Sequence, residues 1–279
     1  MSPKHLCIYH HPCADGFAAA WAMRRFFGDA IEFHPTTYGE APPDVTGRTV
    51  FIVDFSYKRD ALLQIAGQAS SITILDHHAS AQRELVDLPT NVHTIFKMHR
   101  SGCMLTWEFL FPGEMPPVVF DHIEDRDLWK FALRGTREIV AGLYSYPMDF
   151  TTWDDLIPRV RTLHDEGRVL MRNQDKTIAD LIKTTRRRFR FGELTIPVAN
   201  VPYMYASEVA GQMAVGHPFA ATYFDTPEGR KWSLRSAPDG ANVSLIAEAM
   251  GGGGHDHAAG FFQTREEAID FEVDFGVIE

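Results

Sequence analysis

The chain has 279 residues, of which 45% are hydrophobic and 23% charged, as is typical of one large globular domain or two ordinary ones. Its formal net charge of −10 disfavours a protein that holds long nucleic acids on a broad basic surface, but leaves room for a small phosphate ligand held by metal ions. No apolar run reaches the roughly 18 residues that span a bilayer, and three widely spaced cysteines argue against a disulfide framework. These features predict a soluble cytoplasmic protein without membrane partners.

Strand and helix patterns alternate up to about residue 130. Short apolar runs predict strands at 5–10, 30–34, 49–56, 71–76 and 91–96. Helical spacing predicts helices at 16–28, 58–69, 101–111 and 116–131. Trp107, Trp129 and Phe131 are predicted core residues. The alternation predicts an α/β fold with a mostly parallel sheet flanked by helices.

The character of the sequence changes after about residue 150. Residues 151–190 are charged and helix-prone, with interruptions expected at Pro158 and Gly167, and they predict a helical connector. The basic run RRRFR at 186–190 is interpreted as the solvated end of that connector. Strand patterns with a turn at 226–229, and a helix over 242–250, predict a smaller α/β domain with a mixed sheet. The predicted regions are therefore 1–150, 151–190 and 191–279.

Three early strands end on histidine or aspartate. In an open parallel sheet the carboxyl ends of the strands face one crevice, so these side chains are expected to meet there. Each alone is most simply a polar strand terminus, but three together are harder to dismiss, because carboxylates beside apolar strands are costly without partners. The residues concerned are His10, Asp15, Asp54, Asp76, His77 and His78.

This mixture of donors indicates a particular kind of metal site. Aspartate and histidine without paired cysteines suit Mn²⁺, Mg²⁺ or iron better than a structural zinc ion. A carboxylate can bridge two such ions, and two-metal sites commonly cleave phosphate esters by activating a water and neutralising phosphoryl charge.

A second group of candidates lies downstream, in GGGGHDHAAGF at 251–261 and SLRS at 233–236. Consecutive glycines let backbone N–H groups approach an anion, although a glycine run alone is more often a hinge. The forked guanidinium of Arg235 suits a phosphate, although a surface arginine on a strand is about as common without other context. His255 follows the glycines directly.

Taken in order, the segments YHHPCADGFAAA, VDFS, LDHH, IEDRDLWKF, SLRS and GGGGHDHAAGF resemble the DHH phosphoesterase superfamily. The closer resemblance is to the branch that carries the DHH-associated C-terminal domain, which includes oligoribonuclease-like and RecJ-like phosphodiesterases. The resemblance implies a catalytic domain at 1–150, a substrate-binding domain at 191–279, and one or two Mn²⁺ or similar divalent ions.

The resemblance also implies roles for single residues. His78 would face the scissile phosphate, and Asp76 would orient His77. The implied metal ligands are His10, Asp15, Asp54, His77 and Asp125. The implied substrate-binding residues are Arg235, Ser236, Gly252, Gly253, Gly254 and His255.

The first motif departs from the family pattern, because Cys13 stands where an aspartate is usual. That removes an oxygen ligand from one metal and leaves open whether one ion binds or two. His11 competes with His10, and Asp127 with Asp125. Asp125 is preferred because Trp129 then has the spacing of the family motif.

The function expected from these features is a metal-dependent phosphodiesterase that cleaves short oligonucleotides or dinucleotides to mononucleotides. The alternatives are a non-catalytic or weakly active nucleotide-binding module with a degenerate metal site, a RecJ-like single-strand exonuclease, and a pyrophosphatase. No stable complex with long nucleic acid is expected. The oligomeric state, including a homodimer, is left open.

Overall fold

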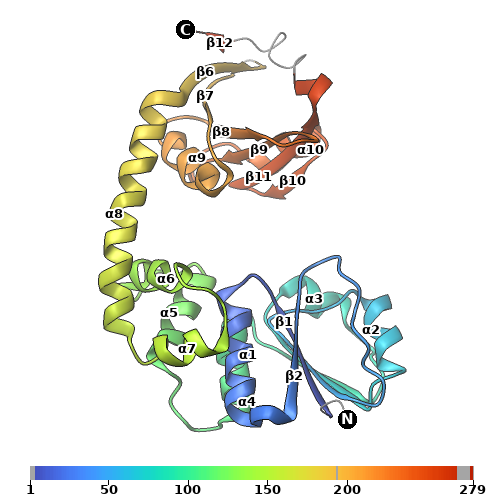
Figure 1. Cartoon of the computed structure of the whole chain (residues 1–279). Coiled ribbons are helices and arrows are strands. Elements are labelled where there is room, and N and C mark those ends of the chain that lie inside the picture. The colour runs from blue at the N-terminus through green and yellow to red at the C-terminus, as the bar shows by residue number, and fades with distance from the viewer. Residues whose placement is uncertain (1–3, 193, 269–276, 279) are drawn as a thin grey trace. The chain divides into compact units, whose positions relative to one another are not determined.

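The computed structural model describes residues 4–192, 194–268 and 277–278. The chain divides into two compact units, Met1–Met171 and Arg172–Glu279, each of which is described by itself (Figure 1). Within the described ranges, no helix combines the length and the apolar character needed to cross a bilayer.

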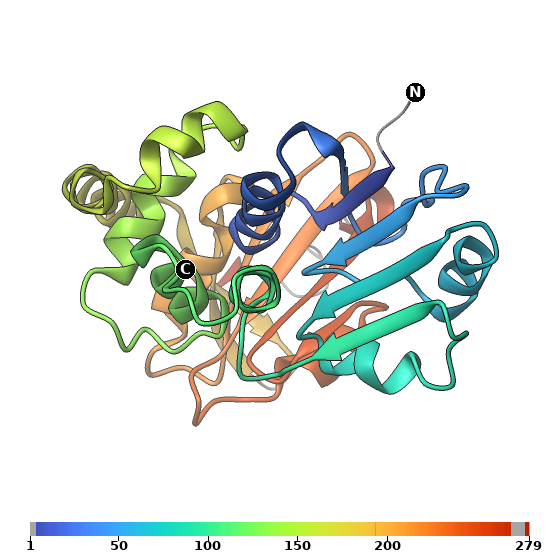
Figure 2. The same cartoon turned by 90° about the horizontal axis from the view of Figure 1, so that it is seen from below.

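The first unit is built on a five-stranded parallel sheet, as the alternating pattern predicts. Its strand order is β2-β1-β3-β4-β5, and Figure 2 shows the five strands pointing the same way. The strands are β1 (His5–His10), β2 (Ile31–Thr36), β3 (Thr49–Val53), β4 (Ser71–Asp76) and β5 (Val92–Phe96).

Both faces of this sheet are buried, which explains why its strands are apolar runs rather than alternating patterns. In β1, Cys7 and Tyr9 belong to one apolar core, whereas Leu6 and Ile8 belong to another. Successive side chains point to opposite faces, so one strand supplies both cores. The helices of the first unit are α1 (Ala14–Phe27), η1 (Gly28–Ala30), α2 (Arg59–Ala66), α3 (Ala79–Glu84), α4 (Gly102–Leu110), α5 (Val118–Asp127), α6 (Thr136–Tyr144) and α7 (Phe150–Leu156).

Helix α5 ends earlier than its sequence pattern predicts. Leu128 closes the helix after Asp127, and the next segment carries left-handed backbone at Trp129 (φ 55°) and Phe131 (φ 48°). Trp107 is buried as predicted, but the prediction of a core position for Trp129 is wrong, since that residue is 74% exposed. The helical periodicity of the sequence continues through residues 128–131 and therefore does not predict the turn there.

Helix α8 (Val160–Thr185) carries the chain from the first unit into the second. The break expected at Pro158 falls between α7 and α8, but α8 continues through Gly167. A Cβ atom at Gly167 would overlap the carbonyl oxygen of Glu138 on α6. The glycine therefore permits close helix packing and does not interrupt α8.

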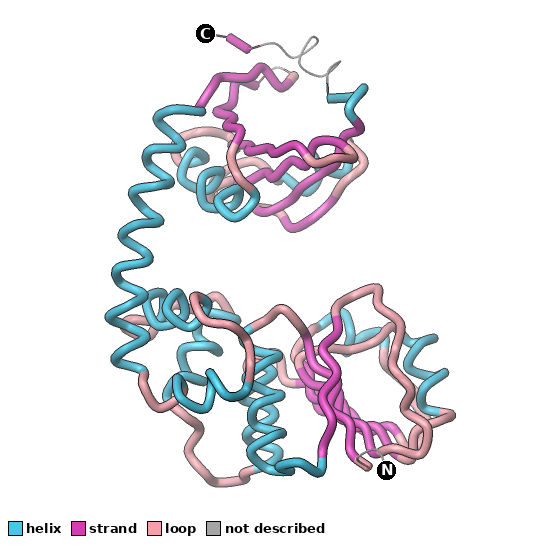
Figure 3. Tube along the Cα trace, viewed as in Figure 1, coloured by secondary structure: helices cyan, strands magenta, loops and turns pink. Residues whose placement is uncertain are grey.

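The second unit is built on a mixed sheet, of which the described residues supply seven strands in the order β10-β11-β9-β8-β7-β6-β12. Figure 3 draws the strands in magenta. The basic run at 186–190 lies in strand β6, so its interpretation as a helix end is wrong; Phe189 is buried in the core while the flanking arginines face outward. The elements are β6 (Arg186–Phe191), β7 (Leu194–Asn200), η2 (Tyr203–Tyr205), α9 (Ala206–Ala214), β8 (Ala220–Asp225), β9 (Gly229–Arg235), α10 (Val243–Ala249), β10 (Gly253–His255), β11 (Ala258–Thr264) and β12 (Val277–Ile278).

Candidate functional site

Polar side chains gather where three adjacent strands of the parallel sheet end. His77 Nε2 lies 3.1 Å from Asp54 Oδ1 and 3.9 Å from Asp15 Oδ2. His10 Nδ1 lies 3.6 Å from Asp54 Oδ2. The same His77 atom is 3.4 Å from Asp127 Oδ2. The residues Asp15, Asp54, His77 and Asp127 are called the carboxylate cluster below.

The main chain turns sharply where β3 delivers Asp54 to the cluster. Asp54 has a left-handed φ of 53°, which is uncommon outside glycine, and its N–H donates to the carbonyl of Leu75 at 2.9 Å. The residue is 1% exposed. The sheet therefore holds this carboxylate in a defined position at the end of the strand.

Asp15 is fixed by the amino end of helix α4, a contact that the sequence does not predict. Its Oδ2 accepts a hydrogen bond from Gly102 N at 2.5 Å, and its Oδ1 accepts one from Cys103 N at 2.9 Å. First-turn N–H groups have no partner within their own helix, so a carboxylate is favourable there. A Cβ at position 102 would overlap the Asp54 side chain, which explains the glycine.

The carboxylate cluster holds more negative charge than its surroundings neutralise. Burial, together with the charges of Asp54 and Asp127, raises the pKa of Asp15. Burial likewise raises the pKa of Asp127. For Asp54 burial acts in the same direction, but contacts with the two histidines outweigh it and lower the pKa to about 2.

His77 responds to this charge. Burial lowers the pKa of its imidazole, but the hydrogen bond to Asp54 and the charges of the other carboxylates outweigh burial and raise the pKa to about 9. A positively charged group is therefore strongly favoured at the centre of the carboxylate cluster.

Two buried carboxylate oxygens in the cluster fit a bound divalent cation. Asp54 Oδ2 and Asp127 Oδ2 are both buried, and neither has a hydrogen-bond partner among the described residues. Such oxygens are costly to desolvate unless a donor or cation meets them. The candidate ligand atoms of Asp15, His77 and Asp127 lie within 4.8 Å of one another, and a second group unites His10, Cys13 and Asp54. Carboxylate and imidazole donors suit Mn²⁺, iron or related ions.

The structure brings Asp127 to the cluster and keeps Asp125 away from it. Asp125 accepts hydrogen bonds from Ala132 N at 2.8 Å, Leu133 N at 3.0 Å and Thr136 Oγ1 at 2.6 Å. Its carboxylate thus shapes the loop between α5 and α6. The geometry replaces Asp125 with Asp127 as the candidate ligand. His10 belongs to a candidate ligand group, whereas His11 belongs to none of the groups formed by described residues.

Asp76 contacts a different histidine ring from the one expected. Its Oδ1 lies 2.6 Å from His78 Nδ1, whereas its contact with His77 is a hydrogen bond from the backbone N–H at 2.7 Å. Ser56 Oγ donates to Asp76 Oδ2 at 2.6 Å. Asp76 therefore orients the His78 ring, and the expectation that it orients the His77 ring is corrected.

Cys13 meets conditions that favour the neutral thiol. Burial raises the pKa of Cys13, and the charges of Asp54 and Asp15 raise it further. Only the thiolate is a good metal ligand. The second ligand group, with His10 and Asp54, is therefore weaker in donors than the carboxylate cluster.

The downstream candidates lie on or beside strands β9 and β10 of the second unit, which are separated by β11. In the register of the sheet, Arg235 on β9 pairs with Ala258 on β11, which pairs with His255 on β10. Paired residues share one face, so Arg235 and His255 flank the small Ala258 side chain. Arg235 Nη2 donates to Ser207 Oγ at 2.7 Å and Nη1 to the Leu234 carbonyl at 2.7 Å. Ser236 Oγ lies 2.9 Å from His257 Nδ1.

The glycine run has a structural explanation in addition to the predicted one. A Cβ at Gly252 would overlap the carbonyl oxygen of Gly260, and one at Gly254 would lie 2.5 Å from that of Ala258. These glycines let β10 lie against β11. By contrast, a Cβ at Gly253 would meet no atom within 4 Å, so this position faces open space.

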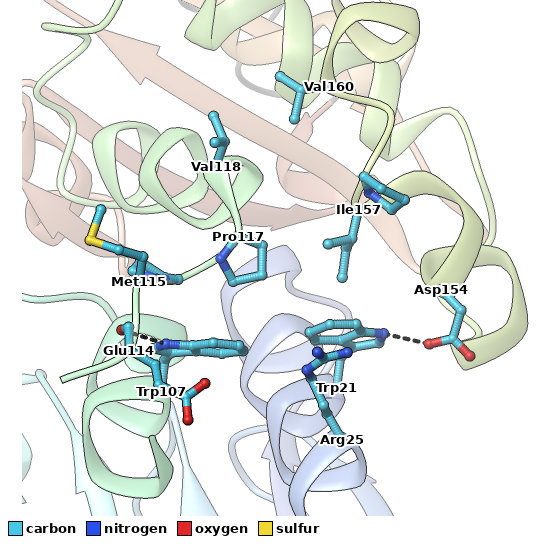
Figure 4. Close-up of a pocket in the computed structure, with 12 residues that line it drawn as sticks. Trp21, Arg25, Trp107, Glu114, Met115, Pro117, Val118, Asp154, Ile157 and Val160 are labelled. Carbon is cyan, nitrogen blue, oxygen red and sulfur yellow. Dashed lines mark hydrogen bonds between the residues drawn. The ribbon is translucent and has the colours of Figure 1, made fainter. Parts of the chain in front are cut away.

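A separate cavity of about 490 Å³ in the first unit contains none of the predicted site residues. Figure 4 shows Trp21 and Trp107 side by side beneath Pro117 and Ile157. Both indole N–H groups already donate, Trp21 to Asp154 Oδ1 and Trp107 to the Glu114 carbonyl. The cavity is thus lined by both apolar and polar groups, and its two indole donors are already used.

Comparisons with known proteins agree with this architecture. No family model matches the chain. Uncharacterized protein R106 of Acanthamoeba polyphaga mimivirus is 29% identical over 300 residues, which cover 98% of this chain and 71% of that protein. The pGpG-specific phosphodiesterase PggH from Vibrio cholerae superposes with a TM-score of 0.57 at 13% identity and covers 97% of both chains.

Two further solved structures have similar folds. RecJ from Thermus thermophilus, in complex with Mn²⁺, gives a TM-score of 0.52 at 15% identity and covers 98% of this chain but 51% of RecJ. An exopolyphosphatase-related protein from Bacteroides fragilis gives 0.50 at 13% identity, with coverage of 98% and 91%. The chain shares its fold with these proteins, and this agrees with the fold that the motif resemblance implies. At these identities the likeness concerns the fold and not the substrate.

Proposed function

We propose that the protein is a metal-dependent phosphodiesterase that cleaves short oligonucleotides or dinucleotides to mononucleotides. The observation that carries the proposal is a pair of buried oxygens, Asp54 Oδ2 and Asp127 Oδ2, that accept no hydrogen bond from described residues. Each faces only an imidazole, at 3.6 Å and 3.4 Å respectively, within a cluster of three carboxylates. The pGpG-specific phosphodiesterase of the same fold supports a dinucleotide substrate. The net charge of −10 supports a short substrate over a long one.

Asp15, Asp54, His77 and Asp127 would hold the ion, with His10 beside Asp54. When bound, a divalent ion supplies water activation and neutralises charge on phosphoryl oxygens. Mn²⁺ is the proposed ion, supported by the donor set and by the RecJ structure with Mn²⁺. Metal binding at this cluster would require His77 to lose its proton, because only the neutral imidazole binds a metal.

His78 would bind the substrate beside the cluster. The hydrogen bond from its Nδ1 to Asp76 raises the pKa of the imidazole, which favours the charged form. The side chain is 35% exposed, so its Nε2 edge can reach a ligand. Its proposed task is to donate a hydrogen bond to a phosphoryl oxygen and, as its pKa allows, to release the proton to the leaving group.

The second unit would bind the free end of the substrate. Arg235, Ser236 and His255, with the open backbone at Gly253, are the proposed contacts, supported by the shared face of β9, β11 and β10. In this proposal residues 1–150 form the catalytic domain, 151–190 the connector and 191–279 the substrate-binding domain. Three free cysteines support a reducing, cytoplasmic location. A homodimer is compatible with the proposal and not required by it.

The first test is hydrolysis of a 5′-phosphorylated dinucleotide with Mn²⁺, followed by chromatography of the mononucleotides. Asp127→Ala should abolish release, whereas Asp121→Ala on the same helix, outside the candidate ligand groups, should retain it. Parallel reactions with a long single strand and with pyrophosphate distinguish the exonuclease and pyrophosphatase alternatives. Release that survives Asp127→Ala would contradict the proposed site.

A non-catalytic nucleotide-binding module is the second candidate, favoured by one observation: the raised pKa of Cys13 in the second ligand group. Such a module would bind a dinucleotide without Mn²⁺-dependent release. If the cysteine only weakens one of two metal positions, Cys13→Asp should raise activity and the number of bound ions together. Tight dinucleotide binding without turnover in both proteins would favour the module.

A further inference from the structure

Arg126 lies at the rim of the carboxylate cluster, held by an aromatic ring. Its guanidinium carbon is 4.9 Å from the centre of the Tyr144 ring, and Nη1 lies 3.4 Å from the Tyr144 hydroxyl. The same hydroxyl accepts a hydrogen bond from Ala14 N at 3.3 Å. Ala14 stands between Cys13 and Asp15, so these contacts tie the guanidinium to the segment that supplies two candidate ligands.

Arg126 forms no direct ion pair with a carboxylate of the described residues, although its charge favours the ionised form of Asp127. Among the ion pairs formed by described residues, none includes Arg126, although Asp125 and Asp127 flank it in sequence. Other arginines of the first unit are paired, such as Arg24 with Asp154 at 2.8 Å and Arg100 with Glu124 at 2.6 Å. A guanidinium has five N–H donors, so most of those of Arg126 remain for a ligand.

The guanidinium donors of Arg126 suit an anionic ligand. A phosphate that approaches three carboxylates is repelled until cations offset their charge. The helix spacing places Arg126 between the loop-shaping Asp125 and the cluster member Asp127. Tyr144 fixes the fork of donors in advance, which reduces the entropy lost when a ligand binds. In the second unit, two donors of Arg235 are already used by Ser207 and the Leu234 carbonyl.

We propose that Arg126 is a substrate-binding residue of the first unit, which donates hydrogen bonds to the non-bridging oxygens of the phosphate at the carboxylate cluster, with Tyr144 as its positioning residue. The inference rests on the proposed phosphodiesterase function and deepens it. It assigns a phosphate contact to a residue that the motif comparison passes over, between two aspartates that compete for the role of ligand.

The test compares Arg126→Ala and Arg126→Lys with Arg137→Ala, a matched control. Arg137 also stacks on an aromatic ring, that of Phe131 at 4.5 Å, but belongs to α6 and contacts no cluster residue among the described interactions. With a dinucleotide and Mn²⁺, Arg126→Ala should lower kcat/KM about 10- to 100-fold, the loss expected for charge-assisted hydrogen bonds. Arg126→Lys should recover part of the loss, Arg137→Ala should stay within about twofold, and added guanidinium ion should partly restore Arg126→Ala.

Two further readouts keep the outcome decisive. Tyr144→Phe, which retains the ring and removes the hydroxyl, should raise KM more than it lowers kcat. Binding of inorganic phosphate to the protein saturated with Mn²⁺, measured by calorimetry, should weaken in Arg126→Ala and not in Arg137→Ala. Unchanged kcat/KM in a folded Arg126→Ala protein would overturn the inference while leaving the phosphodiesterase intact. If the wild-type protein does not hydrolyse the dinucleotide, the proposed function fails. Equal phosphate binding by the wild type, Arg126→Ala and Arg137→Ala would then overturn the inference as well.

Discussion

Asp125 and Asp127 have the same side chain and stand two residues apart, yet they have different tasks. Side chains two residues apart on a helix point in directions that differ by about 200°, so Asp125 and Asp127 cannot both face the same cluster. Asp127 turns toward His77, whereas Asp125 turns toward the backbone of the following loop. The assignment depends on where α5 faces the sheet, which the local sequence does not contain.

The two aspartates are therefore expected to differ in the effects of substitution. Asp127→Asn should weaken Mn²⁺ binding at least about 10-fold with little loss of stability, because it removes a charged ligand. Asp125→Asn should lower the free energy of unfolding by about 2 kcal/mol, because the amide is a poorer acceptor for the three loop donors. Calorimetric Mn²⁺ titration and chemical denaturation of both variants check this. The reverse pattern would restore Asp125 as the ligand.

Metal binding should release protons at neutral pH. His77, with a pKa of about 9, carries a proton in the metal-free protein at pH 7.5 and must lose it to become a ligand. Affinity for Mn²⁺ should accordingly rise with pH up to about 9. Calorimetry in two buffers of different ionisation enthalpy should report about one proton released per ion. Absence of proton release would show that His77 is already neutral or is not a ligand.

At the scale of elements, the sequence predicts the strands better than the helix ends. All five strands of the parallel sheet lie where apolar runs place them, because burial on both faces leaves a clear signal. The end of α5 and strand β6 differ from the prediction. Hydrogen bonds from the following loop to the Asp125 carboxylate accompany the early end of α5. Pairing with β7 makes residues 186–191 a strand. The partners in both contacts are close in sequence, but apolar periodicity does not record hydrogen bonds or strand pairing.

The candidate site follows the same division. Strand ends identify His10, Asp54 and His77 from the sequence alone, because topology brings the carboxyl ends of parallel strands together. The support given to Asp15 by α4 could not be predicted, since it joins residues 87 positions apart. The signal that remains in the sequence is small: a glycine follows the Ser101 N-cap, where a larger residue would not fit.

Helix α4 should therefore be sensitive at its first residue. Gly102→Ala should lower the free energy of unfolding by about 1–3 kcal/mol and weaken Mn²⁺ binding, because the new Cβ would displace Asp54. Gly211→Ala, at an exposed position of α9 with no atom within 4 Å of the new Cβ, is the control and should stabilise the protein by about 0.5–1 kcal/mol. Thermal and chemical denaturation measure both. Equal effects would mean that α4 adjusts freely around the cluster.

At the scale of the whole molecule, each unit contains its own buried core. Phe120 belongs to the first unit and Phe219 to the second, and both are fully buried. Separate cores predict separate unfolding transitions, since contacts within each unit carry its stability.

Scanning calorimetry should resolve these transitions. Phe219→Ala should lower only the transition of the second unit, by about 3–5 kcal/mol, because it opens a cavity in that core. Mn²⁺ should raise only the transition of the first unit, because a ligand stabilises the unit that binds it. Phe120→Ala should lower only the transition of the first unit, because Phe120 belongs to that core. A single transition that moves with every change would indicate that the units unfold together.

The three thiols differ in access, which makes them a natural set of chemical reporters. Cys7 and Cys103 are 0% exposed, whereas Cys13 is only partly buried and stands beside His10 and Asp54. Burial raises the pKa of all three, so alkylation of the native protein should be slow and should reach Cys13 first. Mass spectrometry of this one modification would then follow occupancy of the neighbouring ligand group without any introduced label.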